Sequence, residues 1–394
     1  MITVTEAQRI MMAQVRRTST AHLELAQAAG HHLAVPVTAP YDHPLFDMSA
    51  VDGYAFAYGS APTNWRVVAS LAAGDVHRDP LQADECARIY TGAMIPPGAD
   101  TVVMQEFVTR SHDTITHNDP RLVVGSNVRR QGEQVRKGDE VLPAGTYVGA
   151  TAIGLLATVG ARKVDVHVRP RVNVLRTGGE FMAHDAPAPG RIFSSNEDML
   201  VQALVQAGLT SCEVFTAEDE PHELERTIVD GAKADVLLTT GGVSVGDHDL
   251  LRPALERLGA TIHFHGVVQK PGKPMLFASL NGKPVFALPG NPRAVLVLYH
   301  MYVQPFLRAM QGDHTPWPRK ELLPITHPVR LKGERTEFRA AVVRNGQVTL
   351  LADEGSHMLR TLIDADALAL IPADVRALEP GDPVEVHYLY AWTK

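Results

Sequence analysis

The stretch LLTTGGVSVGDHDLL, residues 237–251, decides the fold class of this chain. An apolar run stops in two threonines and two glycines, and two carboxylates, Asp247 and Asp249, follow before an apolar helix pattern begins. A buried strand, a glycine-rich turn and a helix are typical of a parallel α/β sheet. The glycines would let backbone N–H groups approach a phosphate, with a divalent metal between the phosphate and the carboxylates. The alternative is a tight turn whose aspartates only cap the next helix.

Alternation of strands and helices continues on both sides of this stretch. Strands are predicted in RVNVLRTGGE, CEVFTAEDE, TIHFHGVVQ, KPMLFASL and KPVFALPG, and helices in SSNEDMLVQALVQAG, PHELERTIVDGAKA and DHDLLRPALERLG and from Pro292 to about Met310. This order predicts a doubly wound, mostly parallel sheet with helices on both faces. Ligands bind such sheets at the carboxyl ends of the strands, where every glycine-rich segment of this region falls.

The rest of the chain shows other patterns of apolar and polar residues. Together with the α/β region, these patterns predict a multidomain protein of α/β and β parts. Two helical patterns open the chain, the second in STAHLELAQAAG, and a third occupies YVGATAIGLLATVG. Short alternating runs broken by Gly, Pro and Asp lie between them. The predicted domains are a helical N-terminal domain (1–45 and 143–170), a β-rich insert (46–142), the α/β domain (171–319) and a C-terminal β domain (320–394).

Composition restricts the partners. The 394 residues carry a formal net charge of −7, so no global field attracts nucleic acid or anionic lipid, and any phosphate must be held locally. With two cysteines, a disulfide framework and a CxxC metal site are excluded. The N-terminus reads as an amphipathic helix without a leader pattern, so a cytoplasmic protein is expected, with no nucleic-acid or membrane partner.

Polar and glycine-rich residues at the strand ends are the candidate site. Arg176 to Glu180 (RTGGE) end the first predicted strand, Asp219 and Glu220 follow the second, and LPGNP (288–292) precedes the last helix. Lys270 and Lys273 in KPGKP lie on a backbone fixed by prolines, which favours an oxyanion site over a solvated basic loop. Each motif alone is also compatible with an ordinary turn or helix cap. The Walker pattern and GxGxxG are absent, which excludes P-loop NTPases and standard dinucleotide folds.

Long motifs in this chain resemble a known family. TTGGVSVGDHD, KPGKP and LPGNP are similar to the molybdopterin-binding domain of molybdenum cofactor biosynthesis proteins, and SAVDGYA (49–55) and TGAMIPPGADTVVMQE (91–106) resemble the molybdopterin molybdenumtransferase (MoeA/gephyrin) family. The resemblance covers essentially the whole chain. It implies four domains, the last of them β-barrel-like. It also implies a homodimer whose active site lies between the α/β domain of one subunit and the insert of the other.

The resemblance implies site residues, which are carried over position by position. The implied catalytic residues are Asp52, Glu180, Asp219 and Asp249. The implied substrate-binding residues are Thr91, Thr177, Gly178, Ser195, Asn196, Gly241, Gly242, Ser244, Lys270, Lys273, Pro289, Pro292, Arg339 and Ser356. Asp247 and Asp249 are the expected ligands of Mg²⁺. Gly266 and Met358-Leu359 depart from the family pattern near the expected oxyanion contacts.

The implied reaction inserts molybdenum from molybdate into adenylylated molybdopterin and releases AMP. Mg²⁺ would act as a Lewis acid, because cleavage of a phosphoanhydride needs charge neutralisation more than covalent help. Two alternatives are a molybdopterin adenylyltransferase, which shares the TGGVS segment, and a molybdopterin-binding scaffold without activity. Further expected partners are the molybdopterin adenylyltransferase and acceptor molybdoenzymes.

Overall fold

The structure is a computed structural model that describes residues 1–60, 63–181, 189–218, 220–243, 250–331, 333–352, 355 and 358–389. It divides into two compact units. Unit 1 comprises Met1–Ala21, Gly30–His32 and His167–Lys394, and unit 2 comprises His22–Ala29 and Leu33–Val166. The predicted multidomain α/β and β architecture is confirmed, and the four predicted domain boundaries stay a prediction. No helix among the described residues is both long and apolar enough to cross a bilayer.

The central sheet of unit 1 has the strand order β14-β13-β15-β19-β18-β16. Its strands are β13 (Val172–Thr177), β14 (Val214–Ala217), β15 (Val236–Thr240), β16 (Thr261–His265), β18 (Leu276–Leu280) and β19 (Lys283–Leu288). The first four strands of this order are mutually parallel, whereas β18 is antiparallel to both β19 and β16. The carboxyl ends of β13, β15 and β19 therefore lie next to one another at one edge of the sheet.

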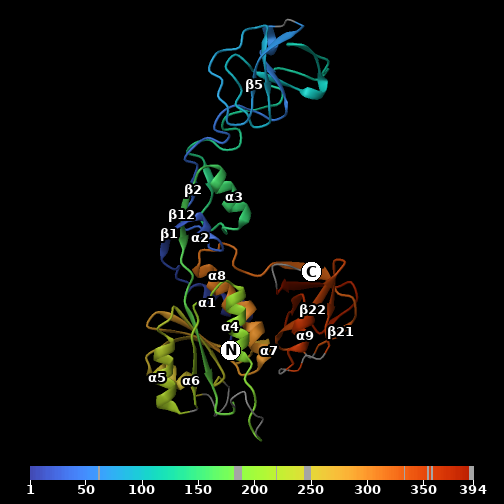
Figure 1. The fold of residues 1–394 in the computed structure, drawn as a ribbon. Coiled ribbons are helices and arrows are strands. Elements are labelled where there is room, and N and C mark those ends of the chain that lie inside the picture. The colour runs from blue at the N-terminus through green and yellow to red at the C-terminus, as the bar shows by residue number, and fades with distance from the viewer. Residues whose placement is uncertain are drawn as a thin grey trace. The chain divides into compact units, whose positions relative to one another are not determined.

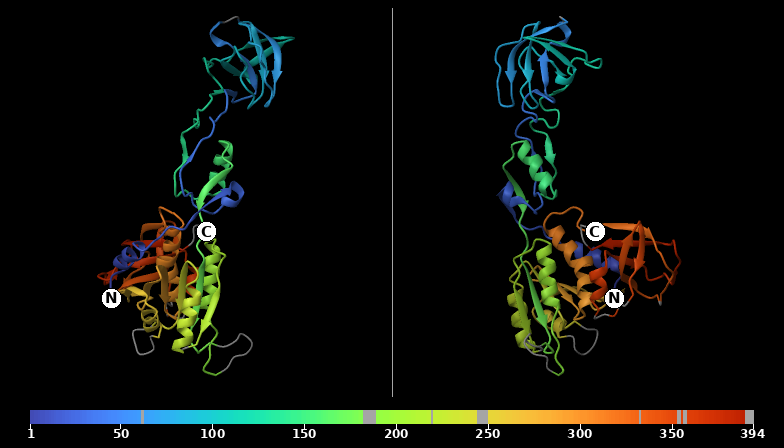
Figure 2. Two further views of the ribbon diagram at one scale, coloured as in Figure 1. Left: turned by 90° about the vertical axis from the view of Figure 1, so that its left-hand side faces the viewer. Right: turned by 45° about the vertical axis from the view of Figure 1, so that its right-hand side comes forward.

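Helices cover both faces of this sheet, as the alternation predicts (Figures 1 and 2). They are α1 (Val4–Met12), α4 (Asn196–Gln206), α5 (Pro221–Gly231), α6 (Leu251–Arg257), α7 (Pro292–Leu298) and α8 (Gln304–Met310), with a π-helical turn at Tyr299–Val303. Successive residues of a strand point to opposite faces. Val174 thus joins one apolar cluster with Leu200 of α4, and Leu175 joins another with Leu224 of α5. Helix α1 belongs to the first cluster through Met11.

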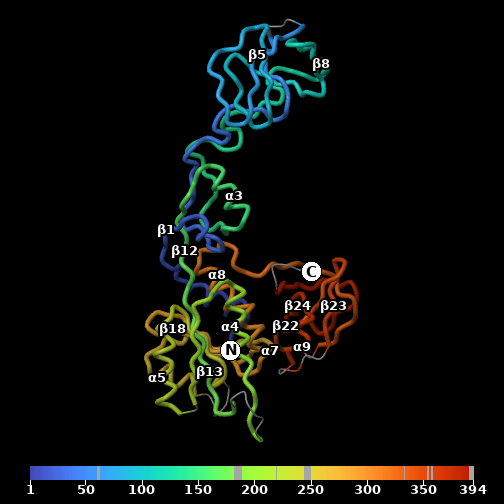
Figure 3. Tube along the Cα trace, viewed as in Figure 1, coloured from blue at the N-terminus to red at the C-terminus, as the bar shows by residue number. Residues whose placement is uncertain are grey.

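The C-terminal part of unit 1 is a second sheet with the order β17-β22-β24-β26-β20, and β23 pairs with β22. Strands β22, β23 and β24 are labelled in Figure 3. Its elements are β17 (Gln269–Lys270), β20 (Lys320–Pro324), β22 (Thr336–Arg344), β23 (Gln347–Leu350), β24 (Ala367–Ile371) and β26 (Pro383–Tyr388), beside the pair β21 (Val329–Arg330) and β25 (Ala377–Leu378) and helix α9 (Arg360–Asp364). The two residues of β17 come from the α/β region, so this sheet incorporates Lys270, the first residue of the KPGKP segment.

Unit 2 contains the predicted β-rich insert, whose sheet has the order β7-β4-β6-β5-β9-β8. These strands are β4 (Gly53–Phe56), β5 (Trp65–Leu71), β6 (Glu85–Ile89), β7 (Thr101–Met104), β8 (Val108–Ser111) and β9 (Thr114–His117). The remaining elements include β2 (Val37–Thr38), β3 (Met48–Ser49), β10 (Val128–Arg129), β11 (Glu140–Leu142), α3 (Ala150–Thr158) and 3₁₀ turns at Tyr58–Ser60 and Gln105–Phe107.

One sequence prediction is wrong. The helix expected in STAHLELAQAAG is instead the strand β1 (Thr20–Glu24) followed by the short helix α2 (Leu25–Ala28). β1 pairs with β12 (Lys163–His167). Thr20, His22 and Glu24 are exposed in alternation with half-buried neighbours, which is the period of a strand. The partner strand, about 140 positions away in the chain, overrides the helical spacing of the alanines and leucines.

A buried histidine makes the stability of the protein depend on pH. His300, in the π-helical turn, is 7% exposed and its Nδ1 lies 3.2 Å from Gln304 Oε1. Burial lowers the pKa of His300 to about 4. The unfolded chain binds this proton at a pKa of about 6.5, so stability falls as the pH drops from there toward 4.

Urea unfolding should therefore show a free energy about 2 kcal/mol lower at pH 5 than at pH 7.5 through this group alone. His300→Gln should remove that part of the pH dependence, whatever its effect on stability at pH 7.5. His222→Gln on the exposed start of α5 is the matched control. If the free energy of unfolding depended on pH in the same way in His300→Gln and in the unaltered protein, this role of His300 would be contradicted.

Candidate active site

The carboxyl ends of β13 and β15 meet so closely that only glycine fits. Gly241 and Gly242 have φ of +87° and +64°, in the left-handed region. A Cβ on Gly241 would lie 2.5 Å from Thr177 O, and one on Gly242 would lie 2.8 Å from Thr177 Oγ1. The Thr177 hydroxyl donates to Thr240 O at 3.4 Å. The two glycines are thus required by contact between the strands, in addition to any contact with a ligand.

A cavity of about 540 Å³ lies beyond these strand ends, and we call it the aromatic cavity. It is lined by Glu180, Phe181, Ile192, Phe193, Ser194, Ser195, Asn196, Val243, Lys273, Pro274, Pro289, Gly290, Asn291 and Pro292. Phe193 and Ile192 are about half exposed, at 49% and 56%. Large apolar side chains open to solvent beside a carboxylate favour a flat, polar-edged organic ligand.

Asn196 offers this cavity a buried acceptor. Its side-chain nitrogen donates to Thr240 Oγ1 and to Gly290 O, both at 2.8 Å. Its Oδ1 is buried and has no hydrogen-bond partner among the described residues. A buried acceptor without a donor costs free energy unless a ligand or water supplies one. Asn196 therefore suits a ligand that carries an N–H donor.

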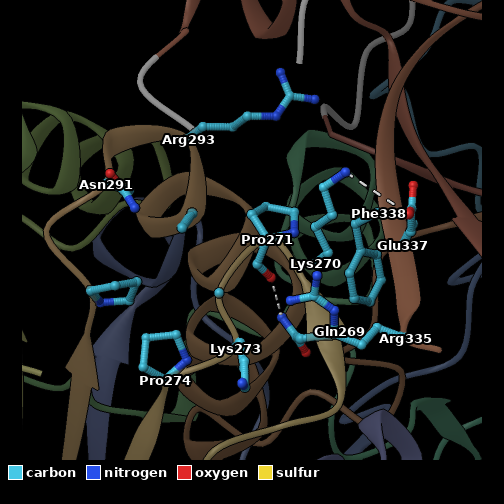
Figure 4. Close-up of a pocket in the computed structure, with 13 residues that line it drawn as sticks. Gln269, Lys270, Pro271, Lys273, Pro274, Asn291, Arg293, Arg335, Glu337 and Phe338 are labelled. Carbon is cyan, nitrogen blue, oxygen red and sulfur yellow. Dashed lines mark hydrogen bonds and ion pairs between the residues drawn. The ribbon is translucent and has the colours of Figure 1, made fainter. Parts of the chain in front are cut away.

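A second cavity of about 230 Å³, the lysine cavity, shares one wall with the first (Figure 4). It is lined by Gln269, Lys270, Pro271, Gly272, Lys273, Pro274, Pro289, Asn291, Arg293, Ala294, Arg335, Glu337 and Phe338. Lys273, Pro274, Pro289 and Asn291 belong to both linings. Asn291 is the N-cap of α7 but makes no side-chain capping bond, so its amide stays exposed at this shared wall.

The two predicted lysines have different surroundings. Lys270 Nζ lies 3.9 Å from Glu337 Oε1, because β17 and β22 pair in parallel and place these residues in register. In Figure 4 Lys270 reaches toward Glu337, whereas Lys273 points away from this pair. The charge of Lys270 is thus partly compensated. Lys273, on the wall of both cavities, is the better placed of the two to hold an anion beside an organic ligand.

The backbone of the KPGKP segment is held from both sides. Gln269 is fully buried, and its side chain donates to Pro271 O at 2.8 Å and accepts from the Tyr302 hydroxyl. Gly272 has a φ of +88°, and a Cβ there would lie 2.9 Å from atoms of Leu298. Because the segment is fixed before any ligand binds, little conformational entropy is lost on binding.

Two arginines of the lysine cavity were missed by sequence reasoning. Arg335 is exposed and lines the cavity, whereas the predicted Arg339, on β22, pairs with Ala369 of β24 and lines neither cavity. Arg293 is 2% exposed and donates to Thr361 Oγ1 at 2.6 Å. In Figure 4 its guanidinium points away from Lys273. Neither arginine lies in a glycine-rich motif, so no local signal pointed to them.

In unit 2, Asp52 and Thr91 form a hydrogen-bonded pair. Asp52 Oδ1 accepts from the backbone N–H and from the hydroxyl of Thr91, both at 2.8 Å. These bonds, with a smaller contribution from Arg88, lower the pKa of Asp52. Arg88 also stacks on Tyr90 at 4.8 Å. The predicted carboxylate is thus ionised and oriented, and its neighbours Arg88 and Tyr90 were not predicted.

The other predicted residues are placed as follows. Glu180, Ser195, Pro289 and Pro292 line the aromatic cavity, and the carboxylate of Glu180 packs against Gly178, which has a φ of +126°. Asp219, Ser244, Asp247, Asp249 and Ser356 lie outside the described residues. Among the described residues no group of three His, Cys, Asp or Glu side chains is arranged to bind a metal. The roles assigned to all these residues stay predictions.

Family models match almost the whole chain. Residues 2–160 match the MoeA N-terminal region (domain I and II), residues 173–309 match a probable molybdopterin binding domain, and residues 323–389 match the MoeA C-terminal region (domain IV).

Curated relatives and solved structures agree with these matches. A molybdopterin molybdenumtransferase of Nostoc sp. is 34% identical over 385 residues, which covers 92% of this chain and 87% of that protein. One of Bacillus subtilis is 32% identical and covers 98% and 93%. The crystal structure of a molybdopterin biosynthesis MoeA protein from Pyrococcus horikoshii OT3 superposes with a TM-score of 0.86 at 27% identity, covering 98% of this chain and 100% of that chain.

Proposed function

The chain belongs to the MoeA family of molybdopterin molybdenumtransferases, and from this premise we propose that it inserts molybdenum from molybdate into adenylylated molybdopterin, with release of AMP. The observation that carries the proposal is the shared wall of the two cavities. An anion held in the lysine cavity lies next to an organic ligand held in the aromatic cavity, with Lys273 and Asn291 facing both.

Molybdate is a tetrahedral dianion, and the lysine cavity offers Lys273, Lys270 and Arg335 to it. A pterin ring is flat, with N–H donors at its edge. It would lie against Phe181 and Phe193 and donate to the unpartnered Asn196 Oδ1. This orientation would direct the dithiolene toward Lys273, where both sulfurs bond to molybdenum and their two protons leave with one molybdate oxygen as water.

Release of AMP is a hydrolysis. Water adds to the phosphorus of the molybdopterin phosphate, the bond from that phosphorus to the bridging oxygen breaks, and AMP leaves with the bridging oxygen. Glu180, on the wall of the aromatic cavity, would accept the proton of that water. Asp247 and Asp249 have the oxygen donors that Mg²⁺ prefers, and the ion would neutralise phosphate charge when bound. We further propose a homodimer in the cytoplasm that works with the molybdopterin adenylyltransferase and acceptor molybdoenzymes.

The test is a reconstituted reaction of purified protein with adenylylated molybdopterin, Mg²⁺ and molybdate, in which AMP and molybdenum-loaded cofactor are measured. Both products should appear in equal amounts and depend on molybdate. A parallel reaction with molybdopterin and ATP but no molybdate tests for adenylyltransferase activity, and formation of adenylylated product there would overturn the proposal. Inactivity in both reactions, with tight molybdopterin binding retained, would identify a scaffold.

A further inference from the structure

A third cavity, of about 220 Å³, lies at the opposite edge of the central sheet of unit 1, and we call it the arginine cavity. Its charged lining residues are Arg16, Arg17, Arg169, Lys283 and Asp235. Lys283 is the first residue of β19, and Asp235 directly precedes β15. The strands run about 20 Å from here to the aromatic cavity, so the two sites are separate.

The cations of this cavity are held close together by the backbone. A Cβ on Gly282, in the turn between β18 and β19, would lie 3.6 Å from Arg16 Nη1, so the guanidinium rests on the turn that precedes Lys283. A Cβ on Gly208 would lie 3.5 Å from Arg169 Cζ, which places that guanidinium against the carboxyl end of α4. Three separate chain segments therefore bring positive charge to one small cavity.

Arg16, Arg17 and Lys283 form no ion pair with a carboxylate among the described residues. Arg16 makes no ion pair with any described residue, and Arg17 contacts the ring of His314 at 3.4 Å. Lys283 Nζ donates to two backbone carbonyls, Ala232 O at 3.0 Å and Lys233 O at 2.8 Å. The single lining carboxylate, Asp235, is already paired with Arg171 and accepts from the Arg171 backbone N–H at 2.8 Å.

The carboxyl end of a helix could also attract Arg16 and Arg17, but they do not cap one here. The carboxyl end of α8 also borders the cavity at Met310, and a helix end of this kind attracts cations. However, Met310 O already accepts from the backbone N–H of Thr18 at 2.9 Å and from its hydroxyl at 3.3 Å. The exposed guanidinium groups of Arg16 and Arg17 are therefore available to a ligand.

We propose that the arginine cavity binds a small anion that carries phosphate. Guanidinium groups form paired, charge-assisted hydrogen bonds with phosphate oxygens, and several cations around one cavity suit a multivalent anion. The volume is smaller than that of a typical drug-sized pocket, so the ligand is a free small anion or one phosphate group of a small metabolite. The site is independent of the proposed reaction.

The experiment is titration of the full-length protein with pyrophosphate by isothermal calorimetry at low salt. Lys273→Met is used as the background, so that anion binding in the lysine cavity is weakened. Adding Arg16→Gln and Arg17→Gln should weaken binding about a hundredfold, about tenfold for each charge removed. Adding Lys233→Gln instead should leave binding unchanged, since Lys233 pairs with Asp230 and does not line the cavity.

Three outcomes would overturn the proposal. The first is equal affinity for pyrophosphate with and without the Arg16→Gln and Arg17→Gln substitutions. The second is loss of pyrophosphate binding on Lys233→Gln, and the third is tighter binding of citrate than of pyrophosphate. Titration with inorganic phosphate and with AMP then distinguishes a free anion from the phosphate group of a metabolite. Circular dichroism of each variant shows whether it is folded, and both arginines are exposed enough for the fold to survive their replacement.

Discussion

Replacing Lys273 with methionine should raise the molybdate concentration at half-maximal rate about thirtyfold, because a charge-assisted hydrogen bond to the dianion contributes about 2 kcal/mol. Affinity for molybdopterin should change much less, since methionine preserves the apolar part of the wall shared by the two cavities. Steady-state kinetics with molybdate as the varied substrate measures the first quantity, and fluorescence titration with molybdopterin measures the second.

Substitution of Glu337, the ion-pair partner of Lys270, should change the half-saturating molybdate concentration in the opposite direction. Glu337→Gln removes the carboxylate 3.9 Å from Lys270 Nζ, so the half-saturating molybdate concentration should fall about threefold, a modest change because Lys270 is half exposed and screened by solvent. Lys233→Met, at a paired lysine outside both cavities, is the matched control for loss of a positive charge. If Lys273→Met altered only pterin affinity, the lysine would belong to the phosphate site instead.

Gly241→Ala should lower the free energy of unfolding by about 3 kcal/mol. The alanine would have to adopt a left-handed φ, and its Cβ would lie closer to a neighbouring atom than van der Waals contact allows. The contact is with the backbone carbonyl of Thr177, at 2.5 Å, which cannot rotate away as a side chain would. Urea unfolding at neutral pH measures the loss.

The control for this substitution is in the neighbouring glycine-rich turn. Gly179 has no left-handed φ, and a Cβ there would meet nothing within 4 Å, so Gly179→Ala should change stability by less than about 0.5 kcal/mol. Equal stabilities for the two variants would show that the ends of β13 and β15 separate at little cost, and that the glycines serve the ligand alone.

The sequence by itself determined the α/β core and the position of its glycine-rich turns. The spacing of apolar residues predicts strands such as Val172–Thr177, and the turn residues Asn291 and Pro292 predict the start of a helix. Both signals lie within a few neighbouring residues. The long motifs also identified the family, which the matches to the whole chain confirm. These properties depend on neighbouring residues, so they can be read without knowing which segments meet.

The tertiary structure decided which segments meet. It turned residues 20–24 into a strand against β12, and through the pairing of β17 with β22 it set Glu337 against Lys270 and brought Arg335 to the lysine cavity. It also gathered Arg16, Arg169 and Lys283 around one cavity. Such contacts join residues tens to hundreds of positions apart, and they follow from strand pairing and core packing, which leave no local pattern in the sequence.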